Sequence, residues 1–146
     1  MDNAVDGVIL FSFGSVVNTT YMPHGMKVKF ADAFRRFPNY TVIWKMDDQL
    51  PEEMRSVSNI KVFRWLPQRA ILRHPKLKLC IMHGGYNSLL ETVLSGVPML
   101  LIPLFGDQHT NSQRAARLGL ALVLDKMSLT AQSIADSISE VLHDYR

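Results

Sequence analysis

The stretch Ile81–Pro98, IMHGGYNSLLETVLSGVP, joins an apolar run to a segment of helical spacing and decides the fold class. His83 and two glycines separate the two parts. A strand, a glycine turn and a helix in this order are typical of a parallel sheet covered by helices. The strand over 77–82 is apolar almost throughout, so we expect it at the centre of the sheet, covered on both faces.

The same alternation of strand-like and helix-like segments runs along the whole chain. It predicts strands over residues 8–13, 41–45, 60–64, 77–82, 99–102 and 121–124, and helices over residues 26–37, 67–73, 88–95, 107–118 and 130–143. No repeat or linker divides the sequence, so we predict one layered α/β domain over residues 1–146. In such a domain ligands bind beyond the carboxyl ends of the strands.

Composition excludes several classes of protein. The 146 residues are 47% hydrophobic and carry a net charge of +3 with no run of like charge, which does not favour nucleic-acid binding. The longest nearly apolar run, 97–105, contains two prolines and is much shorter than the roughly 20 residues of a membrane-spanning helix. The single cysteine, Cys80, lies in an apolar run and is expected to be a buried hydrophobic residue rather than a reactive thiol.

The turn at His83-Gly84-Gly85 has two readings. Glycines let a ligand approach the backbone, and the N–H groups of residues 85–88 at the helix start would then face an anion. A tight turn without a ligand explains the same glycines equally well.

The helix after this turn also allows two interpretations. Ser88 and Glu91 match a capping box, which is the stronger structural interpretation. In the functional alternative Asn87 contacts the anion, and Glu91 accepts hydrogen bonds from the hydroxyls of an attached sugar.

Other polar and aromatic residues follow the predicted strands. Trp65 could offer a flat face to a base, but local pattern favours core packing. Gln68 could bind the edge of a stacked ring, and an exposed polar helix face explains it as easily. Asp107 suits a helix N-cap. Its neighbour Gln108 is a weak candidate for hydroxyl binding. Ser15 is either a phosphate donor or a turn residue.

Known phosphate and metal motifs are missing from the sequence. It contains neither G-x-x-x-x-G-K-[ST] nor a G-x-G-x-x-G after a strand, which disfavours an ATPase or a dinucleotide dehydrogenase. The spacings of His74, Cys80, His83 and His109 match no usual zinc pattern, so no metal site is expected.

Taken in order and spacing, FSFGS, WLPQRAILRHP, HGGYNSLLETVLSGVP and PLFGDQHTN closely resemble the donor-binding half of the UDP-glycosyltransferases. The resemblance covers nearly the whole chain and is strongest to the animal UDP-glucuronosyltransferase and UDP-glucosyltransferase group. It implies the Rossmann-like, C-terminal half of a GT-B glycosyltransferase, with a parallel sheet covered by helices.

The resemblance also implies a role for each candidate residue. Trp65 would stack on uracil, Gln68 would contact the uridine portion, and Glu91 would bind ribose. Asp107 and Gln108 would hold hydroxyls of the transferred sugar. The diphosphate positions are Ser15, His83, Gly85, Asn87 and Ser88.

For the complete enzyme the resemblance implies an inverting, metal-independent transfer of glucuronosyl or glucosyl to a small hydrophobic acceptor that bears a hydroxyl group. No cofactor is expected, since the UDP-sugar is the donor substrate. The acceptor site and the catalytic base would belong to the N-terminal half of the full-length enzyme, which is the expected partner of this chain, and the membrane anchor would also lie outside this chain. We therefore expect no catalytic residue here, a soluble fragment without turnover, and a full-length protein of the endoplasmic reticulum membrane with this half in the lumen.

Two alternatives stay open. One is a non-catalytic module that binds UDP-sugars or other proteins. The other is a related nucleotide-sugar epimerase.

Overall fold

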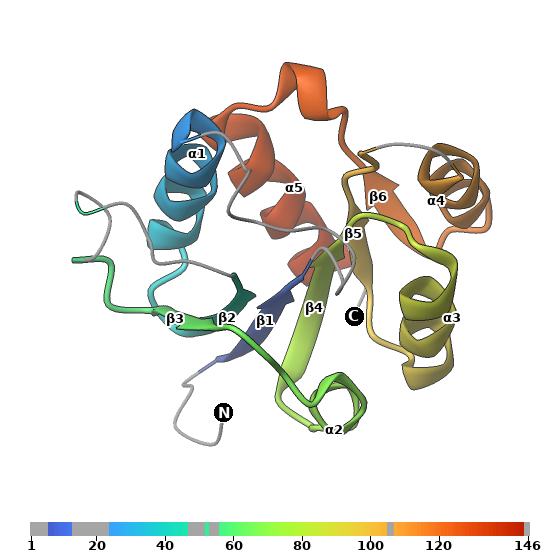
Figure 1. Cartoon of the computed structure of the whole chain (residues 1–146), viewed down its shortest axis with the longest axis horizontal. Helices are drawn as coiled ribbons and strands as arrows, with labels where there is room; N and C mark the ends of the chain where they lie inside the picture. The colour runs from blue at the N-terminus through green and yellow to red at the C-terminus, as the bar shows by residue number, and fades with distance from the viewer. Residues whose placement is uncertain (1–5, 13–23, 47–51, 53–55, 105–106, 145–146) are drawn as a thin grey trace.

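The computed structural model describes residues 6–12, 24–46, 52, 56–104 and 107–144 (Figure 1). Its parallel sheet has the strand order β3-β2-β1-β4-β5-β6. The strands are β1 (Gly7–Phe11), β2 (Tyr40–Lys45), β3 (Ile60–Phe63), β4 (Leu77–Met82), β5 (Met99–Leu101) and β6 (Ala121–Val123). The helices are α1 (His24–Arg35), α2 (Gln68–Leu72), α3 (Tyr86–Ser95), α4 (Gln108–Arg117), the 3₁₀ helix η3 (Lys126–Ser128) and α5 (Ala131–Asp144). The predicted α/β fold class and the central place of β4 are confirmed.

Helices cover both faces of the sheet (Figure 1). Ile9 and Phe11 of β1 lie in the hydrophobic cluster that contains α1 and α5. Val8 and Leu10, on the opposite side of the same strand, pack in the cluster that contains residues of α2 and α4. Successive side chains of a strand point to opposite faces, so a strand buried on both sides reads as a continuous apolar run.

Aromatic rings fix β1, β2 and α1 to one another. The ring of Phe11 stacks on Trp44 with centroids 4.8 Å apart and lies 4.5 Å from Phe30. Phe34 meets Trp44 edge to face at 5.8 Å. The register of β1 against β2 places Gly7 opposite Tyr40 and Phe11 opposite Trp44. This packing sets where the carboxyl ends of the strands lie.

Element ends differ from the predicted ones by one or two residues. The predicted helix 26–37 is α1, which begins and ends two residues earlier. Hydrogen bonds from Arg36 N to Ala33 O and from Phe37 N to Phe34 O are of the i to i−3 type, so the chain leaves the α-helix after Arg35. The sequence analysis did not predict η3 at all.

The turn between β4 and α3 is packed against α4. Gly84 has a φ of +93°, which lies in the region that favours glycine. Its carbonyl accepts a hydrogen bond of 3.1 Å from Asn111 Nδ2, and a Cβ atom on Gly84 would collide with the buried Ser112 Oγ. The turn therefore requires glycine for both its dihedral angle and its close contact.

We expect Gly84→Ala to lower the free energy of unfolding by about 1–3 kcal/mol, because the strained φ and the collision act together. Urea denaturation measures the change. Gly25→Ala is the control, since no atom of the described residues, apart from the adjoining backbone of its own helix, lies within 4 Å of a Cβ at that position. That variant should unfold at an equal or slightly higher urea concentration. Equal stability of the two variants would contradict the account of the turn.

Cys80 is buried, as the sequence predicts, and burial raises the pKa of its thiol to about 12. An unfolded chain ionises this thiol above a pKa of about 8.5. Because the folded pKa is the higher one, the stability contribution of the neutral thiol is complete below pH 8 and is lost as the pH rises toward 12.

We therefore expect the stability advantage of the unmodified chain over Cys80→Ala to shrink between pH 8 and pH 10.5. The slope is at most about 1.4 kcal/mol per pH unit. Urea unfolding of both proteins across this range measures it, and the variant serves as the control for every other titrating group. An advantage that stays constant would rule out a neutral buried thiol.

Candidate functional site

A cleft of about 590 Å³ opens where β1 and β2 end and α2 and α3 begin. Four of the ten predicted site residues line it: Trp65, Gln68, Ser88 and Glu91. The other lining residues are Ser12, Lys45, Leu66, Pro67, Arg69 and Ala70. The cleft is at the carboxyl edge of the sheet, which is where α/β domains bind ligands.

Trp65 presents its indole to solvent at the rim of this cleft. Its exposed fraction is 73%, so the expectation of core packing is wrong. Leu66, the next residue, packs instead of Trp65 against the hydrophobic cluster that contains residues of α2 and α4. Trp44, the other tryptophan, is fully buried. An exposed indole at a cleft offers a flat surface on which a planar base can stack.

The N-terminus of α3 opens toward the same edge of the sheet. Gly85 is the N-cap residue, and its carbonyl accepts the first helical bond from Leu89 N at 2.9 Å. Ser88 is therefore already the third helical residue, and within the described residues no side-chain cap bond is found at this helix start. The predicted capping box is wrong because the helix begins two residues earlier than expected. Helix geometry leaves the N–H groups of residues 86–88 without a carbonyl four residues before them.

His83 fixes the entry to this helix. Its side chain is buried, and its Nδ1 accepts a hydrogen bond of 2.8 Å from the backbone N–H of Gly85. In a neutral imidazole the proton then resides on Nε2. A Cβ atom on Gly85 would strike the His83 ring. The expectation that the Gly85 N–H faces an anion is thus corrected, because the imidazole already binds it.

Glu91 is held from α2 by two neighbouring side chains. Arg69 Nε lies 3.6 Å from Glu91 Oε1, and Gln68 Nε2 lies 3.3 Å from Glu91 Oε2. Gln68 Nε2 also lies 3.4 Å from Ser88 Oγ. One third of the Glu91 side chain is exposed, so its carboxylate is oriented yet reachable from the cleft. Gln68 is therefore part of this network rather than only an exposed residue of a polar helix face.

The remaining candidates lie beside the cleft or outside the described residues. Asn87 is exposed in the first turn of α3. Asp107 occupies the N-cap position of α4 without a side-chain cap bond, and it too is exposed. Gln108 is only 6% exposed, and its Oε1 accepts a hydrogen bond of 2.9 Å from Leu104 N. Ser15 falls outside the described residues.

Three polar lining residues were missed by the sequence analysis: Ser12, Lys45 and Arg69. Ser12 directly follows β1, and Lys45 is the last residue of β2. Their positions at strand ends were a usable signal, since those ends meet at the ligand edge of the sheet. No local signal marks Arg69, because its partner Glu91 is 22 residues away on another helix.

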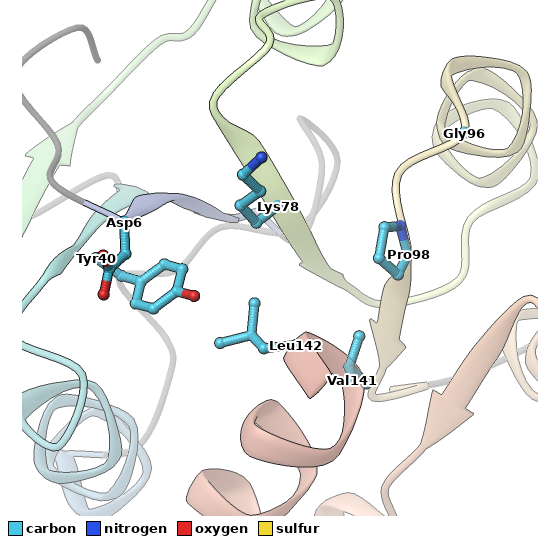
Figure 2. Close-up of a pocket in the computed structure, with 7 residues that line it drawn as sticks. All are labelled: Asp6, Tyr40, Lys78, Gly96, Pro98, Val141 and Leu142. Atoms are coloured by element: carbon cyan, nitrogen blue, oxygen red, sulfur yellow. The ribbon is translucent and has the colours of Figure 1, made fainter. Parts of the chain in front are cut away.

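A second cavity, of about 580 Å³, lies at the opposite edge of the sheet (Figure 2). Tyr40 and Leu142 point into it from β2 and α5 (Figure 2). None of the predicted site residues that the structure describes lines this cavity. It is at the amino ends of the strands, so we assign the candidate site to the cleft beside Trp65.

The described ranges contain neither a candidate metal centre nor a candidate membrane-spanning helix. No three His, Cys, Asp or Glu side chains gather there in a group that could hold a metal ion. None of the helices in this part of the chain combines the length and the apolar character needed to cross a membrane.

Comparison with known structures identifies the fold. The glycotransferase of kitacinnamycin superposes with a TM-score of 0.85 at 24% identity, over 97% of this chain and 36% of that one. Os79 from O. sativa in complex with UDP gives a TM-score of 0.84 at 24% identity, over 97% of this chain and 33% of that one. This chain therefore has the Rossmann-like α/β fold of a segment of each of these glycosyltransferases.

Sequence comparison gives closer relatives. Caenorhabditis elegans ugt-60, which is named as a UDP-glucuronosyltransferase, is 47% identical over 94% of this chain and 27% of its own length. Human UDP-glucuronosyltransferase 3A2 is 38% identical over 96% of this chain and 27% of its own length. The ecdysteroid UDP-glucosyltransferase of Autographa californica nuclear polyhedrosis virus is 32% identical over 97% of this chain and 28% of its own length. The chain thus spans about a quarter of the length of these relatives.

The family model described as UDP-glucoronosyl and UDP-glucosyl transferase matches residues 2–146. This match extends over almost the entire sequence, and it agrees with the motifs at the carboxyl edge of the sheet. The chain therefore belongs to the family of UDP-glucuronosyl and UDP-glucosyl transferases.

Proposed function

We propose that this chain binds the UDP-sugar donor of a glycosyl transfer reaction in the cleft between α2 and α3. The observation that carries the proposal is the convergence of an exposed indole, an oriented carboxylate and an uncapped helix N-terminus at one edge of the sheet. These three features match the three chemical parts of uridine diphosphate. Relatives named for UDP-glucuronosyl and UDP-glucosyl transfer support the choice of ligand.

The uridine portion would lie along the rim of the cleft. Uracil stacks on Trp65, whose ring is not occupied by core packing. Gln68 contacts the uridine portion, and Glu91 accepts hydrogen bonds from the ribose hydroxyls. Because Gln68 and Arg69 hold both oxygens of Glu91, the carboxylate is oriented before the nucleotide arrives.

The diphosphate would lie at the start of α3. Backbone N–H groups of residues 86–88 and the positive end of the helix dipole attract an anion there. The first turn of α3 contains no acidic residue, and Glu91 follows one turn later. Ser15, His83, Gly85, Asn87 and Ser88 complete this proposed phosphate site. His83 and Gly85 contribute mainly through their mutual hydrogen bond, which sets the direction of the helix start.

The transferred sugar would extend toward the start of α4. The exposed carboxylate of Asp107 is suited to accept hydrogen bonds from sugar hydroxyls. Gln108 belongs to the same subsite, although its Oε1 already accepts a bond from Leu104. Its part in the subsite therefore includes shaping the backbone that leads to Asp107.

For the complete protein we propose an inverting, metal-independent transfer of glucuronosyl or glucosyl to a small hydrophobic acceptor bearing a hydroxyl group. A base outside this chain deprotonates the acceptor, which attacks the anomeric carbon while UDP departs. Donors at the start of α3 stabilise the negative charge that develops on the diphosphate. By itself the chain binds the donor without turnover. We further propose that the complete protein resides in the endoplasmic reticulum membrane with this half in the lumen.

We expect UDP to change the fluorescence of Trp65 and to protect it from iodide quenching, because the bound nucleotide covers the indole. The buried Trp44 is inaccessible to iodide in either state, so the change in quenching reports on Trp65. Trp65→Ala should remove the signal and weaken UDP binding, measured by calorimetry, by about 1–3 kcal/mol. Phe63→Ala is the matched control, because Phe63 is an exposed aromatic residue that does not line the cleft. The proposal fails if the unmodified chain shows no saturable UDP binding.

We expect Glu91→Ala to weaken the binding of uridine and of UDP by the same factor, equivalent to about 1–3 kcal/mol, since both ligands contain the ribose. Calorimetric titration with each ligand measures the factor. Glu140→Ala, which removes an exposed carboxylate on α5, is the control and should leave both affinities unchanged. Unchanged affinity in folded Glu91→Ala would exclude the ribose contact.

A further inference from the structure

Side chains bind both backbone polar groups of Leu104, in the connection between β5 and α4. Its N–H donates to Gln108 Oε1 at 2.9 Å. Its carbonyl accepts a hydrogen bond of 2.5 Å from Lys126 Nζ. The two contacts come from different elements, since Gln108 begins α4 and Lys126 begins η3. Leu104 is therefore fixed from two directions, three residues before Asp107.

Lys126 is itself held in place by the fold around it. Asp125 Oδ1 accepts a hydrogen bond of 2.9 Å from Met127 N, and Asp125 O accepts one of 3.0 Å from Ser128 N. These bonds form the turn of η3. Just before it, Leu124 N donates to Leu101 O at 2.8 Å, which ties the end of β6 to β5. Lys126 therefore extends from a defined turn beside β5 and contacts Leu104, which follows that strand.

The contact is stronger than an ordinary backbone hydrogen bond. An ammonium group donating to a carbonyl forms a charge-assisted bond, and both partners here are partly buried. Removing the ammonium would leave the Leu104 carbonyl without this donor and loosen Leu104, whose N–H donates to Gln108 Oε1 at the start of α4. Asp107, the residue directly before Gln108, would then lose its defined position.

We propose that Lys126 is a positioning residue for sugar recognition, which acts on Asp107 through the Leu104 carbonyl. The proposal rests on the proposed function, in which Asp107 binds hydroxyls of the transferred sugar. Neither Leu104 nor Lys126 lines the cleft beside Trp65. Lys126 therefore affects affinity for the sugar portion of the donor and leaves affinity for the UDP portion unchanged.

The test compares the binding of UDP, UDP-glucose and UDP-glucuronic acid by calorimetry. Lys126→Met removes the ammonium group and keeps an unbranched side chain, whereas Lys126→Arg retains a cationic donor. Lys29→Met is the matched control, because Lys29 is an exposed lysine of α1 on the other side of the molecule from α4 (Figure 1). Urea unfolding of each variant confirms that only folded proteins are compared.

We expect Lys126→Met to raise the Kd of at least one UDP-sugar roughly 3- to 10-fold while the Kd of UDP changes less than twofold. Lys126→Arg should restore most of the loss, and Lys29→Met should change nothing. Equal losses for UDP and UDP-sugars, or no loss for either sugar nucleotide, would overturn the positioning role and leave the proposed function intact. Absence of UDP binding by the unmodified chain would overturn the proposed function, and this inference with it.

Discussion

The hydrogen bond from the Gly85 N–H to His83 Nδ1, together with the close contact of Gly84 with α4, is the constraint on which the candidate site depends. It determines where the chain turns after β4 and therefore where α3 begins. A bulkier residue at either glycine would move the helix start or displace the imidazole. The direction of the first N–H groups of α3, at which we propose that the diphosphate binds, follows from this turn.

Charge is distributed along α3 in a way that suits a ligand with a negative and a neutral polar part. No acidic side chain lies in the first turn, and the carboxylate of Glu91 is one turn further along. Arg69 pairs with Glu91, which offsets part of the repulsion that this carboxylate would exert on a diphosphate. The network of Gln68, Arg69 and Glu91 thus joins α2 to α3 and orients the carboxylate in one set of contacts.

The nucleotide and the transferred sugar are proposed to bind at the ends of different strands. The cleft next to β1 and β2 is lined by four of the residues proposed for the nucleotide, and the two residues proposed for the sugar lie at the start of α4. The two regions share the sheet as a rigid base, because β4 and β5 pair directly from Cys80 to Met82. Separate loops on a common sheet allow sugar preference to change while the nucleotide site is retained.

The sequence by itself determined the α/β class, the central strand over 77–82 and the set of residues near the ligand edge, because apolar period and glycine turns act locally. It also determined the family through the order and spacing of its motifs. Tertiary structure alone decided that Trp65 is exposed, that Ser88 does not cap α3 and that the Gly85 N–H is bound to His83. It alone decided that Arg69 meets Glu91 and that Lys126 holds Leu104, because residues 22 apart in the chain are brought together only by the packing of the sheet and its helices.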